Sequence, residues 1–285
     1  MTVRVGVIDY LNVRPMYYRI EERLAGRDVE YVYGVPTTLN RMLVRGEIDI
    51  APISAIETAR HADILSIVPG LGIATLGAVK TVLLFSWVPD PVELDGQPVA
   101  LSDHSATSVA LLRVLCREYY RVTPHFLVRP QRLDAMLAEA QAALLIGDDA
   151  LVEGTRRRPL PPRGIPYLFD LGDEWLKWTG LPFVFALWSV RKDRRAEIEA
   201  AGVIPALYES KEDGLAHLEV IARTYAPRLH LEPGVCLKYL RDLRYDLTED
   251  DVQGLRTFLH HALPQGLPAP LTLWAPGWAH PRPLW

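Results

Sequence analysis

Short apolar runs rich in β-branched residues alternate with helical periodicity over the first 70 residues. This pattern predicts buried strands that are each followed by a helix. The predicted strands cover residues 3–8, 29–34, 48–53 and 64–68. The predicted helices cover residues 16–25 and 36–45, with Gly46 ending the second, and a third begins at Ser54. Such alternation favours parallel strands joined by right-handed crossovers.

The pattern changes at residues 69–78, a glycine-rich segment without a period. A long apolar strand is predicted at 79–88, and its place after a complete α/β unit indicates a connection into a second lobe. A second long strand at 182–190 can lead back. The segments between them repeat the first plan, with predicted strands at 99–101, 126–128, 142–146 and 167–170 and predicted helices at 105–120, 133–139 and 172–178.

From residue 193 onward the periodicity is helical. The predicted helices cover residues 194–209, 211–225, 233–243 and 248–262, and Thr248 and Asp251 have the spacing of a capping box. We expect these helices to pack on the first lobe. The fold class predicted is therefore α/β with two lobes and a ligand cleft between them. We predict that residues 1–83 and 191–285 form lobe 1 and that residues 84–190 form an inserted lobe 2.

The composition narrows the range of functions. The chain has 285 residues, 49% hydrophobic and 23% charged, and a formal net charge of −4, which argues against broad binding of nucleic acid or an anionic membrane. No apolar stretch is long enough to cross a membrane and no signal-peptide pattern is present, so we expect a cytoplasmic protein. Cys116 and Cys236 lie far apart without metal-ligand spacing. We predict buried free thiols, no metal and no cofactor.

The last segment, residues 264–285, contains many prolines and three tryptophans without a period. So many tryptophans are not expected to face water. The segment therefore either packs on its own lobe or contacts a partner subunit, which would make a homodimer.

Common catalytic motifs are missing from the sequence: it contains no G-x-S-x-G, P-loop, Rossmann glycine triplet or H-E-x-x-H. Small polar groups instead recur at the ends of predicted loops. Ligands of α/β proteins bind in loops at the edge of the sheet, so we single out Tyr10, Asn12, Ser54, Thr81, Gly147, Asp148 and Thr179. Asn12 lies between the first strand and Pro15, and its alternative role is to cap the helix there.

The run S-D-H-S-A-T-S at residues 102–108 precedes a strongly periodic helix. Free N–H groups, the positive end of the helix dipole and hydroxyl donors together can bind a carboxylate or phosphate. Ser105, Thr107 and Ser108 are therefore candidate substrate-binding residues. Helix capping by Ser105 or Thr107 is the alternative.

Five motifs in order resemble the chorismate dehydratases of the futalosine route to menaquinone. They are D-Y-L-N-x-x-P at 9–15, R-G-E-I-D-I-A-x-I-S at 45–54, G-x-V-K-T-V-L-L-F-S at 77–86, L-L-I-G-D-x-A-L at 144–151 and D-L-G-x-E-W-x-x-W-T-G-L-P-F-V-F-A-L-W at 170–188. The resemblance covers about the first 190 residues and, more loosely, the helices to about residue 267. That family is similar to the type II periplasmic solute-binding proteins, whose two α/β lobes close on a ligand.

The resemblance implies a lyase that converts chorismate to 3-[(1-carboxyvinyl)oxy]benzoate and water, with a small dicarboxylate as its partner molecule. It implies that Asn12 is catalytic, and that Thr81 occupies the position of a catalytic serine in the family. The family proposal is that the substrate's own side-chain carboxylate takes the proton. Asp148 or His104 is the alternative base.

Two other functions stay open at this point. One is the sister enzyme that forms 1,4-dihydroxy-6-naphthoate on the same fold, although its N-terminal motif differs from D-Y-L-N. The other is a cytosolic protein that binds a small carboxylate without reacting it, because the fold alone does not fix the function.

Overall fold

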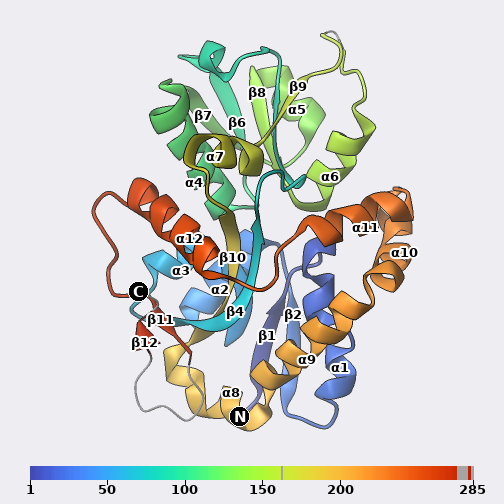
Figure 1. Cartoon of the computed structure of the whole chain (residues 1–285), viewed down its shortest axis with the longest axis vertical. Coiled ribbons are helices and arrows are strands. Elements are labelled where there is room, and N and C mark those ends of the chain that lie inside the picture. Colours follow the sequence, from blue (N-terminus) through green and yellow to red (C-terminus); the bar gives the residue numbers. More distant parts are fainter. Residues whose placement is uncertain (162, 275–281, 284–285) are drawn as a thin grey trace.

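Two lobes, each built on its own sheet, make up the protein (Figure 1). The computed structural model describes residues 1–161, 163–274 and 282–283. The larger sheet has the strand order β12-β11-β4-β10-β3-β1-β2, and the smaller sheet has the order β7-β6-β8-β5-β9. Helices pack on both sheets. The predicted two-lobed α/β class is confirmed.

The N-terminal strands form the parallel part of the larger sheet. β1 (Val3–Val7) lies between β2 (Val29–Tyr33) and β3 (Ile50–Ser54). Both neighbours run parallel to β1. Its three valines are at most 3% exposed, as expected for a parallel strand covered on both faces. The elements that contact β1 or β3 include α2 (Pro36–Arg45), α3 (Ala55–Arg60) and α8 (Arg195–Ala201).

The segment after β1 differs from the single helix predicted at 16–25. A 3₁₀ helix, η1 (Leu11–Tyr17), follows β1 almost directly, and a short α1 (Ile20–Arg23) comes after it. Arg19 separates the two in the left-handed conformation, with φ of 57°. Because η1 begins at Leu11, Asn12 lies in the first turn of a helix and not in an irregular loop.

Two long antiparallel strands form the centre of the larger sheet. β4 (Leu65–Thr75) pairs with β10 (Phe183–Arg191), and β10 also pairs with β3. β4 continues through most of the glycine-rich segment in which no period was found. Leu71, Ile73 and Ala74 are buried there, so pairing with β10 decides the conformation where local preference is weak.

The smaller sheet is mixed. β5 runs antiparallel to β8 and β9, and β6 runs parallel to β7 and β8. Its strands are β5 (Val82–Ser86), β6 (Pro98–Ser102), β7 (His125–Arg129), β8 (Ala142–Ile146) and β9 (Tyr167–Asp170). Its helical elements are η2 (Pro91–Leu94), α4 (Ala106–Val114), the π-helix η3 (Leu115–Tyr120), α5 (Leu133–Glu139), α6 (Gly147–Arg156) and α7 (Leu171–Thr179).

The two sheets divide the chain at other points than the sequence predicted. β5 belongs wholly to the smaller sheet and β10 wholly to the larger one, so neither is split between lobes at residue 83 or residue 190. The connections are the short segments 76–81 and 180–182. Asp170 holds the first of them, because its carboxylate accepts hydrogen bonds from the N–H groups of Val79 (2.9 Å) and Lys80 (2.6 Å).

The C-terminal helices pack mainly on the first lobe, as expected. They are the 3₁₀ helix η4 (Lys192–Arg194), α8, α9 (Val203–Ala216), α10 (Leu218–Leu229), α11 (Pro233–Asp242) and α12 (Glu249–Ala262). Gly202, with φ of +69°, ends α8 and divides the helix predicted at 194–209. The capping box of Thr248 and Asp251 is confirmed. Cys116 and Cys236 are buried and free, also as predicted.

The described part of the C-terminal segment packs on its own lobe. β11 (Thr272–Leu273) pairs with β4 and with β12 (Arg282–Pro283). Trp274 is 4% exposed and lies under the Arg195 guanidinium, 5.3 Å from the ring centre. The other two tryptophans, at 278 and 285, lie outside the described residues, and the homodimer stays a prediction. Among the described helices, none has the length and apolarity needed to cross a membrane.

Candidate active site

A cavity of about 70 Å³ lies where the two lobes meet. It is lined by seven of the residues singled out from the sequence: Tyr10, Asn12, Ser54, Thr81, Ser105, Ser108 and Gly147. Most of the remaining wall is apolar and includes Ile53, Ile73 and Phe185. Both sheets contribute strand ends and loops to it, so the fold brings together polar groups that lie up to 137 positions apart.

Asn12 lies in the first turn of η1. The N-cap of this helix is Tyr10, and no side chain caps it, so Asn12 does not act as the helix cap. The Asn12 Oδ1 atom is buried and has no hydrogen-bond partner among the described residues. Leaving such an acceptor unpaired costs about 1–3 kcal/mol, and the atom can therefore bind a ligand hydroxyl or N–H at little further cost in desolvation.

Thr81 closes the cavity from the first connection between the lobes. It is 3% exposed, and its Oγ1 lies 3.1 Å from the hydroxyl of Tyr239 and 3.4 Å from the carbonyl oxygen of Val79. The Thr81 carbonyl accepts a hydrogen bond from the N–H of Gly147 at 2.8 Å. These contacts fix both the backbone and the hydroxyl of Thr81.

Tyr10 covers one side of the cavity and lies flat against Gly147. A Cβ atom at Gly147 would lie 2.7 Å from Tyr10 Cε2, and Gly147 has φ of +67°, so both space and backbone conformation require glycine. The Tyr10 hydroxyl lies 3.4 Å from Nδ1 of His104. Burial, then the negative charges of Asp149, Asp148 and Asp103, raises the pKa of Tyr10, which therefore stays a neutral donor.

The serines on the cavity are each held by a neighbour. Ser105 caps α4 by accepting from the N–H of Ser108 (3.2 Å), and its hydroxyl donates to Ser108 Oγ (2.9 Å). This leaves the Ser108 hydroxyl proton for a ligand. Ser54 Oγ accepts from the side-chain amide of Asn40 (3.1 Å) and likewise keeps its own proton. Capping and ligand binding are thus compatible for Ser105.

Three of the candidate residues do not line the cavity. Thr107 is 1% exposed and accepts from the N–H of Ile56 at the start of α3, so it joins the two lobes. Thr179 donates to the carbonyl oxygen of Trp175 at 2.8 Å at the end of α7. Asp148 accepts a hydrogen bond from the N–H of Leu11 at 3.0 Å. His104, the alternative base, is also absent from the wall.

Asp148 is the carboxylate near the cavity whose ionisation is most altered, because burial raises its pKa to about 6. The folded protein therefore binds this proton more tightly than the unfolded chain, and the stability that it contributes is lost as the pH rises from about 4 through 6. We expect the free energy of unfolding of Asp148→Asn to rise relative to that of the wild type as the pH rises from about 4 through 6. At pH 8 this relative gain should reach as much as about 3 kcal/mol. Urea denaturation of both proteins at pH 4.5 and pH 8 measures this, and a difference that does not change with pH would refute it.

Two residues important for the site were missed by sequence reasoning. Tyr239 and Asn40 lie inside α11 and α2, and their hydroxyl and amide hold Thr81 and Ser54. Both are buried within amphipathic helices, at 1% and 3% exposure. A polar residue at a buried helix position was the signal that could have identified Asn40, whereas the tyrosine fits an ordinary core pattern.

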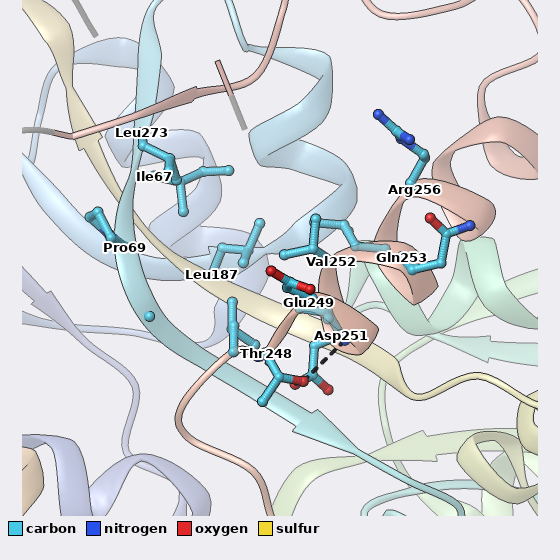
Figure 2. Close-up of a pocket in the computed structure, with 14 residues that line it drawn as sticks. Ile67, Pro69, Leu187, Thr248, Glu249, Asp251, Val252, Gln253, Arg256 and Leu273 are labelled. Atoms are coloured by element: carbon cyan, nitrogen blue, oxygen red, sulfur yellow. Dashed lines mark hydrogen bonds between the residues drawn. The ribbon is translucent and has the colours of Figure 1, made fainter. Parts of the chain in front are cut away.

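A larger cavity of about 320 Å³ lies elsewhere, between β4, β10 and α12 (Figure 2). Its apolar side is formed by residues such as Ile67, Leu187 and Val252. Its polar groups come from the first turns of α12, where Thr248 and Asp251 bind each other in the capping box. None of the residues singled out from the sequence for catalysis or substrate binding lines this second cavity.

Comparisons with known proteins agree with this architecture. The solved structure of protein AF1704 from Archaeoglobus fulgidus is similar with a TM-score of 0.73 and 19% identity, covering 93% of this chain and 97% of that one. The alkanesulfonate-binding protein SsuA from Xanthomonas axonopodis pv. citri is similar with a TM-score of 0.66 and 14% identity, covering 94% of each chain. At these identities the likeness shows the fold, that of the periplasmic binding proteins.

The sequence comparisons are more specific. A chorismate dehydratase of Thermus thermophilus is 35% identical over 263 residues, 89% of this chain and 93% of the relative. A chorismate dehydratase of Campylobacter jejuni is 30% identical over 192 residues, 65% of this chain and 66% of the relative. The family model described as menaquinone biosynthesis matches residues 3–263. The chain therefore belongs to the menaquinone biosynthesis family that this model describes.

Proposed function

We propose that this protein is a chorismate dehydratase, which forms 3-[(1-carboxyvinyl)oxy]benzoate and water in the first step of the futalosine route to menaquinone. The observation that carries the proposal is the position of Asn12 and Thr81. These are the two residues that the motifs of the family mark as catalytic, and both line one cavity between the lobes. The similarity to chorismate dehydratases over most of the chain supports the same reaction.

The cavity suits a ring that carries anionic groups. Ile53, Ile73 and Phe185 offer apolar surface to the ring. The Ser108 hydroxyl and the N-terminus of α4 can donate hydrogen bonds to a carboxylate. Donors on the ring carboxylate stabilise negative charge that moves into it, because the ring proton beside the ether is vinylogous to that group.

Water leaves in two linked bond changes. The C–H bond beside the enolpyruvyl ether breaks, and its electron pair moves through the ring toward the carboxylate. The pair then forms the new ring double bond as the neighbouring C–O bond breaks, and the departing hydroxide is protonated to water. The ring becomes aromatic, so the substrate supplies the driving force while the protein orients it and stabilises the developing charge.

We assign the role of the base to the enolpyruvyl carboxylate of the substrate itself. Neither His104 nor Asp148 lines the cavity, and the Asp148 carboxylate already accepts from the N–H of Leu11. A base must come within about 3 Å of the proton that it removes. The bound substrate carries its own carboxylate on a short ether arm next to that proton.

Binding requires the lobes to move apart. The cavity measures about 70 Å³, whereas pockets for small molecules usually measure roughly 300–1,000 Å³. The short connections at 76–81 and 180–182 are the places where the chain passes between the two sheets. Rotation about them can enlarge the cavity without disturbing either sheet.

Incubation of the purified protein with chorismate tests the proposal, because aromatisation of the ring is followed directly by ultraviolet absorbance. We expect product formation without added metal or cofactor. Binding of chorismate without an absorbance change would instead favour a carboxylate-binding protein. Formation of 1,4-dihydroxy-6-naphthoate from its own precursor, with chorismate inert, would favour the sister enzyme. The same assay applied to the cell fractions tests the cytoplasmic location that we propose for the enzyme.

His104→Ala is expected to retain most of the activity, within about threefold of the wild type, because a positioned base is worth about 100-fold or more and His104 is not the base. The variant loses the contacts of the imidazole with the Tyr10 hydroxyl (3.4 Å) and with the Asp103 carboxylate (3.5 Å). Steady-state kinetics from pH 5.5 to 9 measure the effect. An inactive variant, together with a wild-type rate that falls below about pH 6.5, the ordinary histidine pKa, would identify a histidine base.

A further inference from the structure

We propose that Tyr239 is a positioning residue of this active site, whose hydroxyl sets the orientation of the Thr81 hydroxyl. The inference rests on the proposed function, since Thr81 is one of the two residues that we assign to chorismate dehydration. Tyr239 does not line the cavity and so acts on the substrate only through Thr81.

The contacts of Tyr239 support this role. It lies on α11, 1% exposed, and its Oη is 3.1 Å from Thr81 Oγ1. Thr81 Oγ1 also lies 3.4 Å from the carbonyl oxygen of Val79. Among the described residues, Tyr239 is thus the side chain that contacts the Thr81 hydroxyl.

Counting donors and acceptors gives the orientation of the Thr81 hydroxyl. A tyrosine hydroxyl has one proton to donate and can accept as well. When it donates to Thr81 Oγ1, one acceptor position of the Thr81 hydroxyl is filled. The Thr81 hydroxyl then keeps its own proton for the substrate or for the carbonyl oxygen of Val79.

The helix that carries Tyr239 is itself fixed to the connection between the lobes. Asp242, one turn further along α11, forms an ion pair with Lys80, the residue before Thr81. α11 also contacts η1, which carries Asn12. Burial raises the pKa of Tyr239 far above its ordinary value, so the hydroxyl stays protonated and serves as a donor and not as a base.

Tyr239→Phe tests the inference, because it removes the hydroxyl and keeps the buried ring. We expect kcat with chorismate to fall about 10-fold while KM stays within about twofold, since the loss falls on groups that act in the transition state. Tyr245→Phe is the matched control. Tyr245 is also buried, at 3% exposure, but its hydroxyl has no partner among the described residues, so its removal should leave kcat unchanged.

A double variant that also lacks the Thr81 hydroxyl distinguishes a positioning role of Tyr239 from a general loss of packing. In the double variant Tyr239→Phe/Thr81→Val, kcat should be within about twofold of that of Thr81→Val alone, because residues that act as a unit are not additive. Multiplicative losses, or a Tyr239→Phe enzyme with the kcat of Tyr245→Phe, would overturn the inference and leave the proposed function intact. A wild-type protein without chorismate turnover would overturn the proposed function first, and this role with it.

Discussion

Replacing Asn12 with leucine should lower kcat for chorismate by about 1,000-fold or more and leave the protein folded, which is the largest effect that we expect. One positioned polar group in an active site is worth about 100- to 1,000-fold, and leucine also puts an apolar branch where Oδ1 lies. Asn12 is only half buried, in the short η1 helix, so it contributes little to the core. Steady-state kinetics and circular dichroism measure the two parts of this prediction.

Asn12→Asp is the sharper test, because its shape is nearly that of asparagine. We expect a loss of about 100-fold or more. The aspartate puts a negative charge beside an anionic substrate, and it replaces the amide N–H donors with an acceptor. An Asn12→Asp enzyme with near wild-type kcat would mean that Asn12 does not contact the reacting groups.

Thr81→Val should lower kcat by about 100-fold, because valine has nearly the same shape and lacks the hydroxyl. KM should change little, since the cavity wall is preserved. The variant also leaves the Tyr239 hydroxyl without its partner at 3.1 Å. Comparison of kcat and KM with those of the wild type, at a saturating range of chorismate, measures the effect.

Thr81→Ser is the control for the Thr81 hydroxyl. Serine keeps the hydroxyl and removes only the methyl group, and it is the residue that the family resemblance places at this position. We therefore expect activity within about threefold of the wild type, much closer than Thr81→Val comes. If serine is as inactive as valine, the methyl group and not the hydroxyl matters, and Thr81 is a packing residue.

The sequence alone determined the general plan of the protein. Its short β-branched runs between helical segments indicated two α/β lobes, because burial on both faces of a parallel sheet demands that pattern. Polar residues at loop ends, such as Asn12 after the first strand and Ser54 after the third, were also visible, since ligand sites of this architecture occur there. The five motifs then indicated the family.

Pairing between distant strands decided the conformation of segments in which the sequence shows no period. Residues 69–75 have glycine and proline but no period, and they become part of β4 only because β10, more than 100 positions later, supplies the hydrogen bonds. In the same way β5 joins a single sheet and does not bridge the lobes. Local preference in such segments is weak, so the tertiary partner determines the conformation.

The composition of the site was likewise decided by the tertiary structure. Ser54, Ser105 and Thr107 look alike in the sequence, yet the first two line the cavity while the third caps α3. A periodic helix does not reveal that one buried tyrosine, Tyr239, will reach Thr81. Sequence spacing fixes which residues share a helix face or follow a strand. Contacts between elements more than 150 positions apart depend instead on how whole helices pack, and the complete core determines that packing.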